Sequence, residues 1–260
     1  FGFIELGSVT PEPQAGNPTP RLFRLIRHRA MINRMGFNNK GVDYLLNRIP
    51  DRPRPYVLGI NIGKNLITPV ERALDDYRAG LKKVYAAADY ISLNVSSPNT
   101  PGLRQLQSEK ALDSFLNGID ETRKALQDHH QFDRPIALKV SPDLDNGAIP
   151  AIAELLIKHR IDGLIATNTT MDRSLVKDHR LAAEIGGLSG EPLCQKSRNV
   201  LSAFHQALQG EIPIISVGGI MSPGEAQIRL KLGASLVQIY SGLIYQGPGL
   251  AREIAQAIKI

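Results

Sequence analysis

The sequence predicts an α/β barrel of the (β/α)8 TIM type, because strand-length apolar runs alternate with amphipathic helical stretches along its 260 residues. Apolar residues make up 42% of the chain, which is enough for one large core. Barrels of this class often form a single domain of this length. We therefore expect one domain over residues 1–260, with a parallel sheet whose strands are buried on both faces.

Seven strands and five helices can be assigned in order. The expected strands are Phe3–Val9, Tyr56–Ile62, Tyr90–Val95, Ile136–Val140, Gly163–Ala166, Ile212–Val217 and Leu236–Tyr240. The expected helices are Val70–Ala88, Glu109–Gln127, Ala148–His159, Pro192–Leu208 and Pro223–Leu232. Since a barrel needs one more strand, we expect the first strand and helix upstream of residue 1. A doubly wound open sheet is the competing architecture, but no Gly-x-Gly-x-x-Gly turn follows an early strand.

The stretch from Thr10 to Gly36 interrupts this alternation. It is rich in proline at first and then carries two short apolar runs, Leu22–Ile26 and Ala30–Asn33. We expect a β-hairpin inserted near residues 20–35, on the side of the barrel where loops follow the strands. In barrels those loops build the active site.

Composition argues against several classes of function. The formal net charge of +6 would suit an anionic partner, but the basic residues are scattered and no RNA-binding aromatic motif accompanies them, so no nucleic-acid partner is expected. The single cysteine, Cys194, rules out an intrachain disulfide and makes a Cys-based zinc site improbable. No apolar run is long enough for a transmembrane helix.

Polar residues gather where the apolar strands end. Asn61, Asn94, Lys139 and Asn168 lie at the ends of four different strands, which predicts a ring of donors and acceptors around the barrel mouth. Asn side chains offer both donors and acceptors, as a planar ligand with carbonyl and N–H edges requires. Lys139 would be costly to bury unpaired, so we expect it to meet an anion such as a reduced flavin.

Two glycine-containing turns, Gly218-Gly219 and Ser241-Gly242, follow the last two strands. Glycine lets backbone amides approach a phosphate closely, and Ser222-Pro223 opens a helix directly behind the first turn. A simple strand-to-helix turn is the alternative. We expect a phosphate group here.

Ser97 lies in a loop bounded by prolines, without the neighbours of a hydrolase nucleophile. No Gly-x-Ser-x-Gly elbow surrounds it, and the six His are expected to face solvent. No metal-binding cluster of His and carboxylates is apparent, so no metal is expected. Redox chemistry with an organic cofactor remains.

The loop from Asn94 to Arg104 resembles the active-site loop of class 2 (quinone-dependent) dihydroorotate dehydrogenases. Further matching motifs run in the family's order from Phe1 to Ile260: Ile32-Asn33-Arg34-Met35-Gly36-Phe37-Asn38-Asn39, Ala166-Thr167-Asn168-Thr169-Thr170, Gly186-Gly187-Leu188-Ser189-Gly190, Ser216-Val217-Gly218-Gly219-Ile220 and Gln238-Ile239-Tyr240-Ser241-Gly242. The resemblance implies FMN-dependent oxidation of dihydroorotate to orotate in pyrimidine (UMP) biosynthesis. Electrons would pass to a membrane quinone, ubiquinone or menaquinone.

The resemblance also implies a role for individual residues. Ser97 would be the base that removes a proton from C5 of dihydroorotate, and its being serine rather than cysteine points to class 2. The residues that would bind substrate are Asn33, Arg34, Met35, Gly36, Phe37, Asn94, Asn99, Asn168 and Thr169. Those that would bind FMN are Ser8, Asn61, Asn94, Lys139, Thr167, Gly190, Gly219, Tyr240 and Ser241.

Family members carry an upstream strand with a lysine that reaches flavin and substrate, preceded by a helical segment that touches the membrane. We expect both to precede residue 1, with the protein lying peripherally on the cytoplasmic face of the inner membrane. Two alternatives stay open: a related flavoenzyme, such as a class 1 dehydrogenase or a dihydrouridine synthase, and a non-catalytic module that binds a phosphate ligand or anionic lipid.

Overall fold

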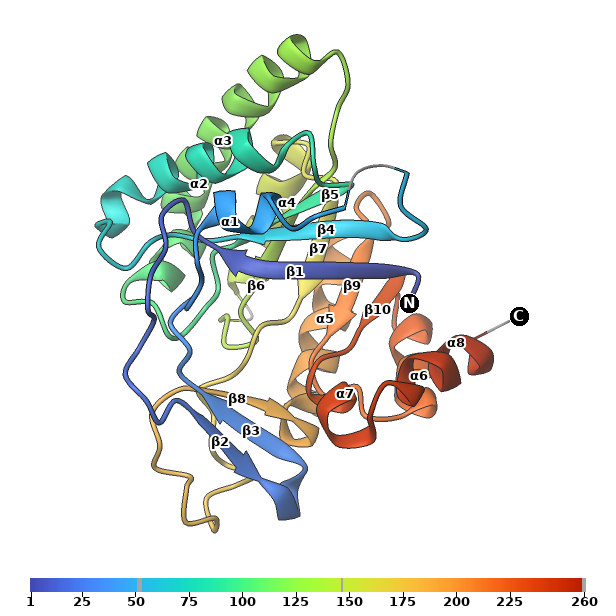
Figure 1. The fold of residues 1–260 in the computed structure, drawn as a ribbon. Helices are drawn as coiled ribbons and strands as arrows, with labels where there is room; N and C mark the ends of the chain where they lie inside the picture. Colours follow the sequence, from blue (N-terminus) through green and yellow to red (C-terminus); the bar gives the residue numbers. More distant parts are fainter. Residues whose placement is uncertain (51–52, 146, 259–260) are drawn as a thin grey trace.

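Seven parallel strands form the large sheet of the computed structural model, which describes residues 1–50, 53–145 and 147–258 (Figure 1). In spatial order they are β1 (Phe3–Val9), β4 (Val57–Ile62), β5 (Tyr90–Asn94), β6 (Ile136–Val140), β7 (Gly163–Ala166), β9 (Ile214–Val217) and β10 (Leu236–Gln238). These are the seven expected strands, with ends shifted by two residues at most. β9 begins after Pro213, a residue that has no backbone N–H to donate to a neighbouring strand.

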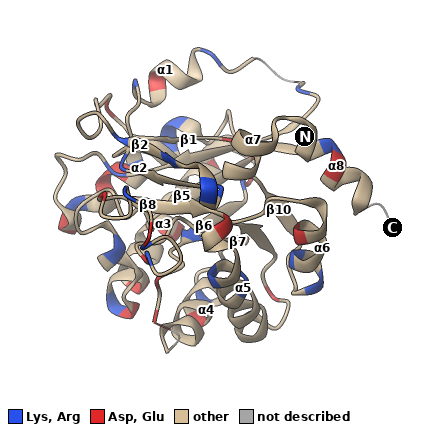
Figure 2. Ribbon diagram, turned by 90° about the horizontal axis from the view of Figure 1, so that it is seen from below, with Lys and Arg blue, Asp and Glu red and all other residues tan. Residues whose placement is uncertain are grey.

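Helices cover the convex face of this curled sheet, as Figure 2 shows. The expected helices are present as α2 (Ala73–Val84), α3 (Glu109–His130), α4 (Ala148–Lys158), α5 (Cys194–Leu208) and α6 (Pro223–Lys231). Three further helices were not predicted: α1 (Val42–Leu46), α7 (Ser241–Gln246) and α8 (Gly249–Ala257). The main core lies between sheet and helices, where Leu93 and Leu138 pack with Tyr77 and Leu116. The arrangement confirms the barrel-type α/β fold.

The expected hairpin is present. β2 (Leu22–Leu25) and β3 (Ala30–Asn33) pair antiparallel within residues 20–35. A third strand, β8 (Gly187–Gly190), pairs with β3 and was not predicted, because its sequence Gly-Leu-Ser-Gly has little strand propensity. The small sheet lies beside the loops after β5 and β7, since Asn99 contacts Asn33 and Thr170 bridges to Leu188.

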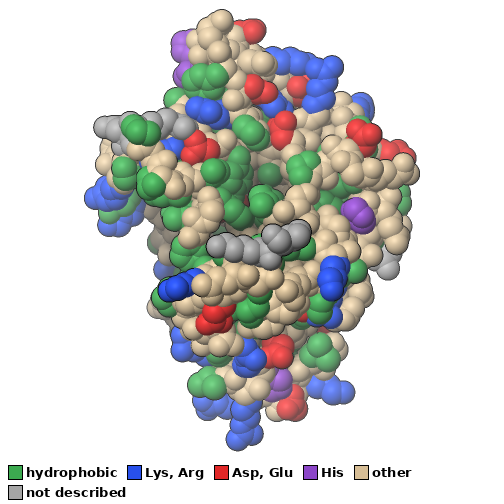
Figure 3. All heavy atoms as spheres, turned by 90° about the vertical axis from the view of Figure 1, so that its right-hand side faces the viewer, with side chains coloured by type: hydrophobic (Ala, Val, Ile, Leu, Met, Phe, Trp, Pro, Cys, Tyr) green, Lys and Arg blue, Asp and Glu red, His purple; other side chains and the backbone are tan. Residues whose placement is uncertain are grey.

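β1 and β10 form the two edges of the large sheet, and among the described residues no strand joins them. Figure 3 shows this side of the molecule, where apolar side chains gather around a hollow. Val57 and Leu236 are about half exposed. The strand expected before residue 1 stays a prediction.

One expectation about histidine is wrong. His159 is buried, and its Nε2 atom lies 2.6 Å from Asp113 Oδ1. His159 follows the last residue of α4, which packs against α3, so the imidazole meets the carboxylate of the neighbouring helix. The pair lies on the helical layer and contributes nothing to the strand ends.

Candidate functional site

Polar side chains meet on the inner face of the large sheet because the strand register puts them at neighbouring positions. Asn61 on β4 pairs with Ser92 on β5, and Asn94 on β5 pairs with Lys139 on β6. Leu93 belongs to the core under the helices. Since successive residues of a strand point to opposite faces, the polar residues face the inside of the curl.

Hydrogen bonds join these side chains into a network from β1 to β7. Asn94 Nδ2 donates to Ser8 Oγ at 2.8 Å, and the Ser8 hydroxyl donates to Asn61 Oδ1. Asn168 Nδ2 donates to Asn94 Oδ1 at 3.1 Å and to Ser96 Oγ at 3.0 Å. The structure therefore brings together four residues that were predicted to bind cofactor or substrate and that lie far apart in the sequence.

Ser97 lies in the loop after β5 and is only 6% exposed. Its hydroxyl accepts a hydrogen bond from the Asn99 amide at 3.2 Å, and Asn99 Nδ2 donates to Asn33 Oδ1 at 3.1 Å. In the part of the chain that the structure describes, no imidazole or carboxylate is hydrogen-bonded to Ser97. The arrangement lacks the base of a hydrolase triad, and it links Ser97 to two of the predicted substrate-binding amides.

The predicted substrate-binding residues that follow β3 contact different parts of the molecule. Arg34 Nη1 forms an ion pair with Glu184 Oε2 at 2.6 Å, which ties the hairpin to the segment before β8. The backbone carbonyls of Met35 and Gly36 accept hydrogen bonds from the preceding loop. Phe37 packs its ring against the turn after β4. Arg34 thus has a structural partner, and Phe37 lies next to the strand end of Asn61.

Glu5 was missed by the sequence reasoning. It lies on the inner face of β1, with a side chain 7% exposed, and its Oε1 atom is 3.5 Å from Lys139 Nζ. Asn61 Nδ2 and Tyr90 OH donate to its two oxygens at 3.1 Å and 3.0 Å. Burial, and then the Glu5 carboxylate, raise the pKa of the Tyr90 phenol, which keeps it a donor. The sequence did contain an indication of this role, because Glu5 is a charged residue between Ile4 and Leu6 in an apolar strand.

The turn that was predicted to bind phosphate, Gly218-Gly219, follows β9. Gly219 has φ of +76°, and α6 begins directly behind it with Ser222 Oγ accepting from the Glu225 amide at 3.2 Å. Arg229, fully buried, donates to the Gly218 carbonyl at 2.8 Å and so holds the turn from behind. This arginine was also missed, because an arginine on an amphipathic helix is usually exposed.

The remaining predicted cofactor residues come from β8 and from the segments after β7 and β10. Ser241, the first residue of α7, donates to Ser189 Oγ at 2.8 Å, which brings it beside Gly190 at the end of β8. Thr167 follows β7 and donates to the next carbonyl at 3.0 Å. Tyr240 is 72% exposed, so most of its side chain faces solvent.

The residues that the structure describes contain no cluster of three or more His, Cys, Asp or Glu side chains arranged to hold a metal ion. None of their helices is long and apolar enough to cross a membrane.

The family model described as dihydroorotate dehydrogenase matches residues 1–260. Proteins named dihydroorotate dehydrogenase (quinone) from Saccharophagus degradans and Chromobacterium violaceum are 54% and 55% identical, with 99% of this chain covered and 76% and 75% of theirs. The crystal structure of DHODH in complex with ferulenol from Eimeria tenella superposes with a TM-score of 0.92 at 38% identity, covering 99% of this chain and 74% of that one.

Proposed function

Since this chain belongs to the dihydroorotate dehydrogenase family, we propose that it oxidises dihydroorotate to orotate in pyrimidine biosynthesis, with FMN as cofactor and Ser97 as base. The relatives named dihydroorotate dehydrogenase (quinone) argue against both alternatives, a class 1 or dihydrouridine-type enzyme and a non-catalytic module. They also support a quinone, ubiquinone or menaquinone, as electron acceptor. Peripheral contact with the cytoplasmic face of the inner membrane belongs to the same proposal.

The residues at the strand ends fit both the ring system and the phosphate group of FMN. Asn61, Asn94 and Ser8 offer neutral donors and acceptors to a ring system with carbonyl and N–H edges, and Lys139 offers a positive charge. Gln238 Oε1 on β10 is buried without a hydrogen-bond partner among the described residues, which leaves an acceptor for a ligand N–H. The Gly219 turn would take the phosphate. When bound, FMN would take the hydride that leaves C6 of dihydroorotate and pass the electrons to the quinone.

Ser97 would remove the proton from C5 while its own hydroxyl proton passes to water or to a neighbouring acceptor. The hydrogen bond from the backbone N–H of Asn99 stabilises negative charge on Ser97 Oγ and so offsets part of the cost of burying that charge. Asn33, Asn99 and Asn168 would hold the ring and carboxylate of the substrate, with Thr169 beside them. Glu5 would limit the positive charge that Lys139 presents to the flavin.

The observation that carries this proposal is the link from the Ser97 hydroxyl through Asn99 to Asn33, which joins the base to the predicted substrate amides. The test is anaerobic reduction of the bound flavin by dihydroorotate in Ser97→Ala and Ser97→Cys proteins. General-base catalysis contributes about 10²- to 10⁴-fold, so Ser97→Ala should be slower by that factor while it still binds FMN and orotate. Ser97→Cys should keep part of the rate. Unchanged flavin reduction in Ser97→Ala would exclude Ser97 as the base.

A further inference from the structure

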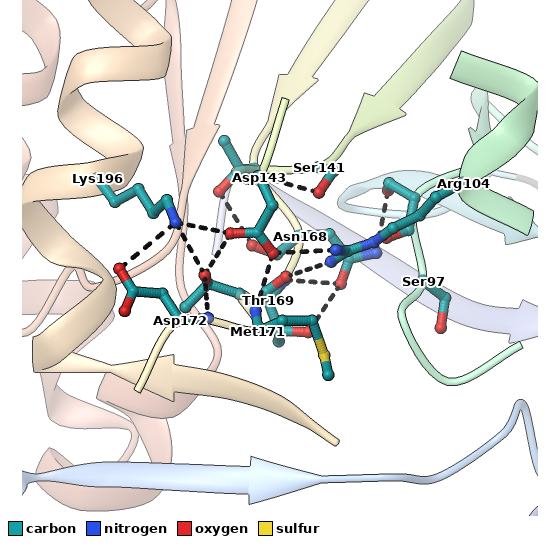
Figure 4. Close-up of polar contacts among 12 residues, drawn as sticks. Ser97, Arg104, Ser141, Asp143, Asn168, Thr169, Met171, Asp172 and Lys196 are labelled. Atoms are coloured by element: carbon teal, nitrogen blue, oxygen red, sulfur yellow. Dashed lines mark hydrogen bonds and ion pairs between the residues drawn. The ribbon is translucent and has the colours of Figure 1, made fainter. Parts of the chain in front are cut away.

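The Arg104 side chain joins the loop that carries Ser97 to the turn that carries Asn168 (Figure 4). Its Nε atom donates to the Ser96 carbonyl at 3.1 Å, and its Nη2 atom donates to the Thr169 carbonyl at 2.9 Å. The two carbonyls belong to residues directly beside Ser97 and Asn168 in the chain. One planar guanidinium therefore spans the two segments through their backbones.

Asp143, in the loop after β6, holds the same guanidinium from a third side. Its Oδ2 atom accepts from Arg104 Nη1 at 2.9 Å and from the Met171 amide at 2.8 Å. Its Oδ1 atom lies 2.8 Å from Lys196 Nζ and accepts from the Thr170 hydroxyl. Burial opposes ionisation of Asp143, yet these donors hold its pKa below the usual value, so the carboxylate is a charged anchor.

We propose that Arg104, anchored by Asp143, is a positioning residue for the proton transfer at Ser97. It sets the distance between the Ser97 loop and the turn of Asn168 and Thr169, and so between the base and the residues that would hold the substrate. The proposal rests on the proposed role of Ser97. Displacement of a reacting group by an ångström costs about 10²-fold in rate, so the position of this loop matters for the chemical step.

Arginine is suited to this task in a way that lysine is not. The guanidinium presents donors in a fixed plane, and here three of its nitrogens serve three different segments, those after β5, β6 and β7. A lysine keeps the charge, and can pair with Asp143, but its single nitrogen cannot hold both carbonyls in the same geometry. Arg104→Lys therefore tests the geometry separately from the charge.

The chain offers a matched control at the opposite end of the strands. Arg123 pairs with Asp133 and Asp162, which lie before β6 and β7, and donates to the Arg160 carbonyl at 3.0 Å. Arg123, like Arg104, is mostly buried and joins three segments. Arg123→Lys should disturb packing to a similar degree without moving the Ser97 loop.

The experiment measures flavin reduction by saturating dihydroorotate in the flavin-loaded holoenzyme, by rapid mixing under anaerobic conditions. Arg104→Lys should slow this step by about 10²-fold, with little change in orotate affinity. Arg123→Lys should reduce its flavin at the rate of the unchanged protein. If Arg104→Lys melts below the assay temperature, Arg104→Gln, which keeps a planar donor, is measured with the same expectation. Equal rates in the Arg104 and Arg123 variants would overturn the proposal.

A double-mutant cycle with Ser97→Ala separates positioning from general structural damage. Groups that act as a unit are strongly non-additive, so Arg104→Lys should slow the Ser97→Ala protein much less than it slows the unchanged one. If Arg104→Lys slows the Ser97→Ala protein by the same factor of about 10² as it slows the unchanged protein, Arg104 does not act through Ser97. If Ser97→Ala alone reduces flavin normally, the failure lies in the proposed base and not in the Arg104 contact.

Discussion

Replacing Arg229 with methionine removes a fully buried guanidinium behind the predicted phosphate turn. Arg229 Nε donates to Glu225 Oε1 at 2.5 Å, Nη1 donates to Ser216 Oγ at 3.1 Å, and Nη2 donates to the carbonyls of Gly218 and Cys194. Methionine refills much of the volume without replacing any donor. The expected result is a large loss of stability, together with a less ordered turn.

The size of this stability loss depends on which partners of Arg229 keep another hydrogen bond. Removing one partner of a buried ion pair costs about 3–5 kcal/mol when the remaining charge has no compensation. Glu225 keeps Arg198, whose Nε donates to it at 2.9 Å, and the Gly218 carbonyl keeps a hydrogen bond from Ser197 Oγ at 2.7 Å. We therefore expect the lower end, about 3 kcal/mol, which for a chain of this size corresponds to a melting temperature roughly 6–12 °C lower.

Arg198→Met is the control, because Arg198 pairs with the same carboxylate but its side chain is 25% exposed. It should cost about 1 kcal/mol or less. Both variants are melted by circular dichroism at one fixed concentration of added FMN, since a ligand that binds the folded state raises the melting temperature. Equal shifts in the two variants, or a shift below about 2 °C for Arg229→Met, would refute the reasoning from burial.

Two further predictions concern the turn and the Asp143 anchor. Gly219→Ala should abolish retention of FMN on purification, because the new Cβ would lie 2.5 Å from Cys194 Cα and would displace the turn. Gly224→Ala is the control, since the nearest atom to its new Cβ is Ser222 Oγ at 4.0 Å. The control should retain flavin as the unchanged protein does. Asp143 has a folded-state pKa below its ordinary value of 3.8, so its ionisation stabilises the protein fully above that pH, and this contribution is lost as the pH falls through the folded-state pKa. In urea unfolding, the difference in free energy of unfolding between the unchanged protein and Asp143→Asn should therefore shrink as the pH falls through that acid range. A difference that stays constant with pH would contradict this prediction.

The sequence alone predicted the seven strands, because a strand buried on both faces must be apolar throughout and is bounded where polar residues begin. β1, β6 and β7 have the predicted bounds. The same rule predicted the polar strand ends of Asn61, Asn94 and Asn168. The hairpin of β2 and β3 was also predicted, because its two apolar runs are separated by a few polar residues. These features depend on neighbours in the chain, which a sequence displays directly.

The local sequence pattern did not predict features that depend on a partner far away in the chain. β8 has no strand signal and exists because β3 lies beside it. His159 was expected in solvent, and it is buried because Asp113 on another helix meets it.

The sequence by itself determined the barrel class, the strand order along the chain and the polar ends that carry Ser97. Only the tertiary structure decided that Glu5 faces Lys139, that Arg104 joins the Ser97 loop to the Asn168 turn, and that Arg229 is buried behind Gly218. The physical reason is that a charged side chain can be buried only where it finds a partner. Those partners come from other strands through register and packing, which act between residues that are far apart in the chain.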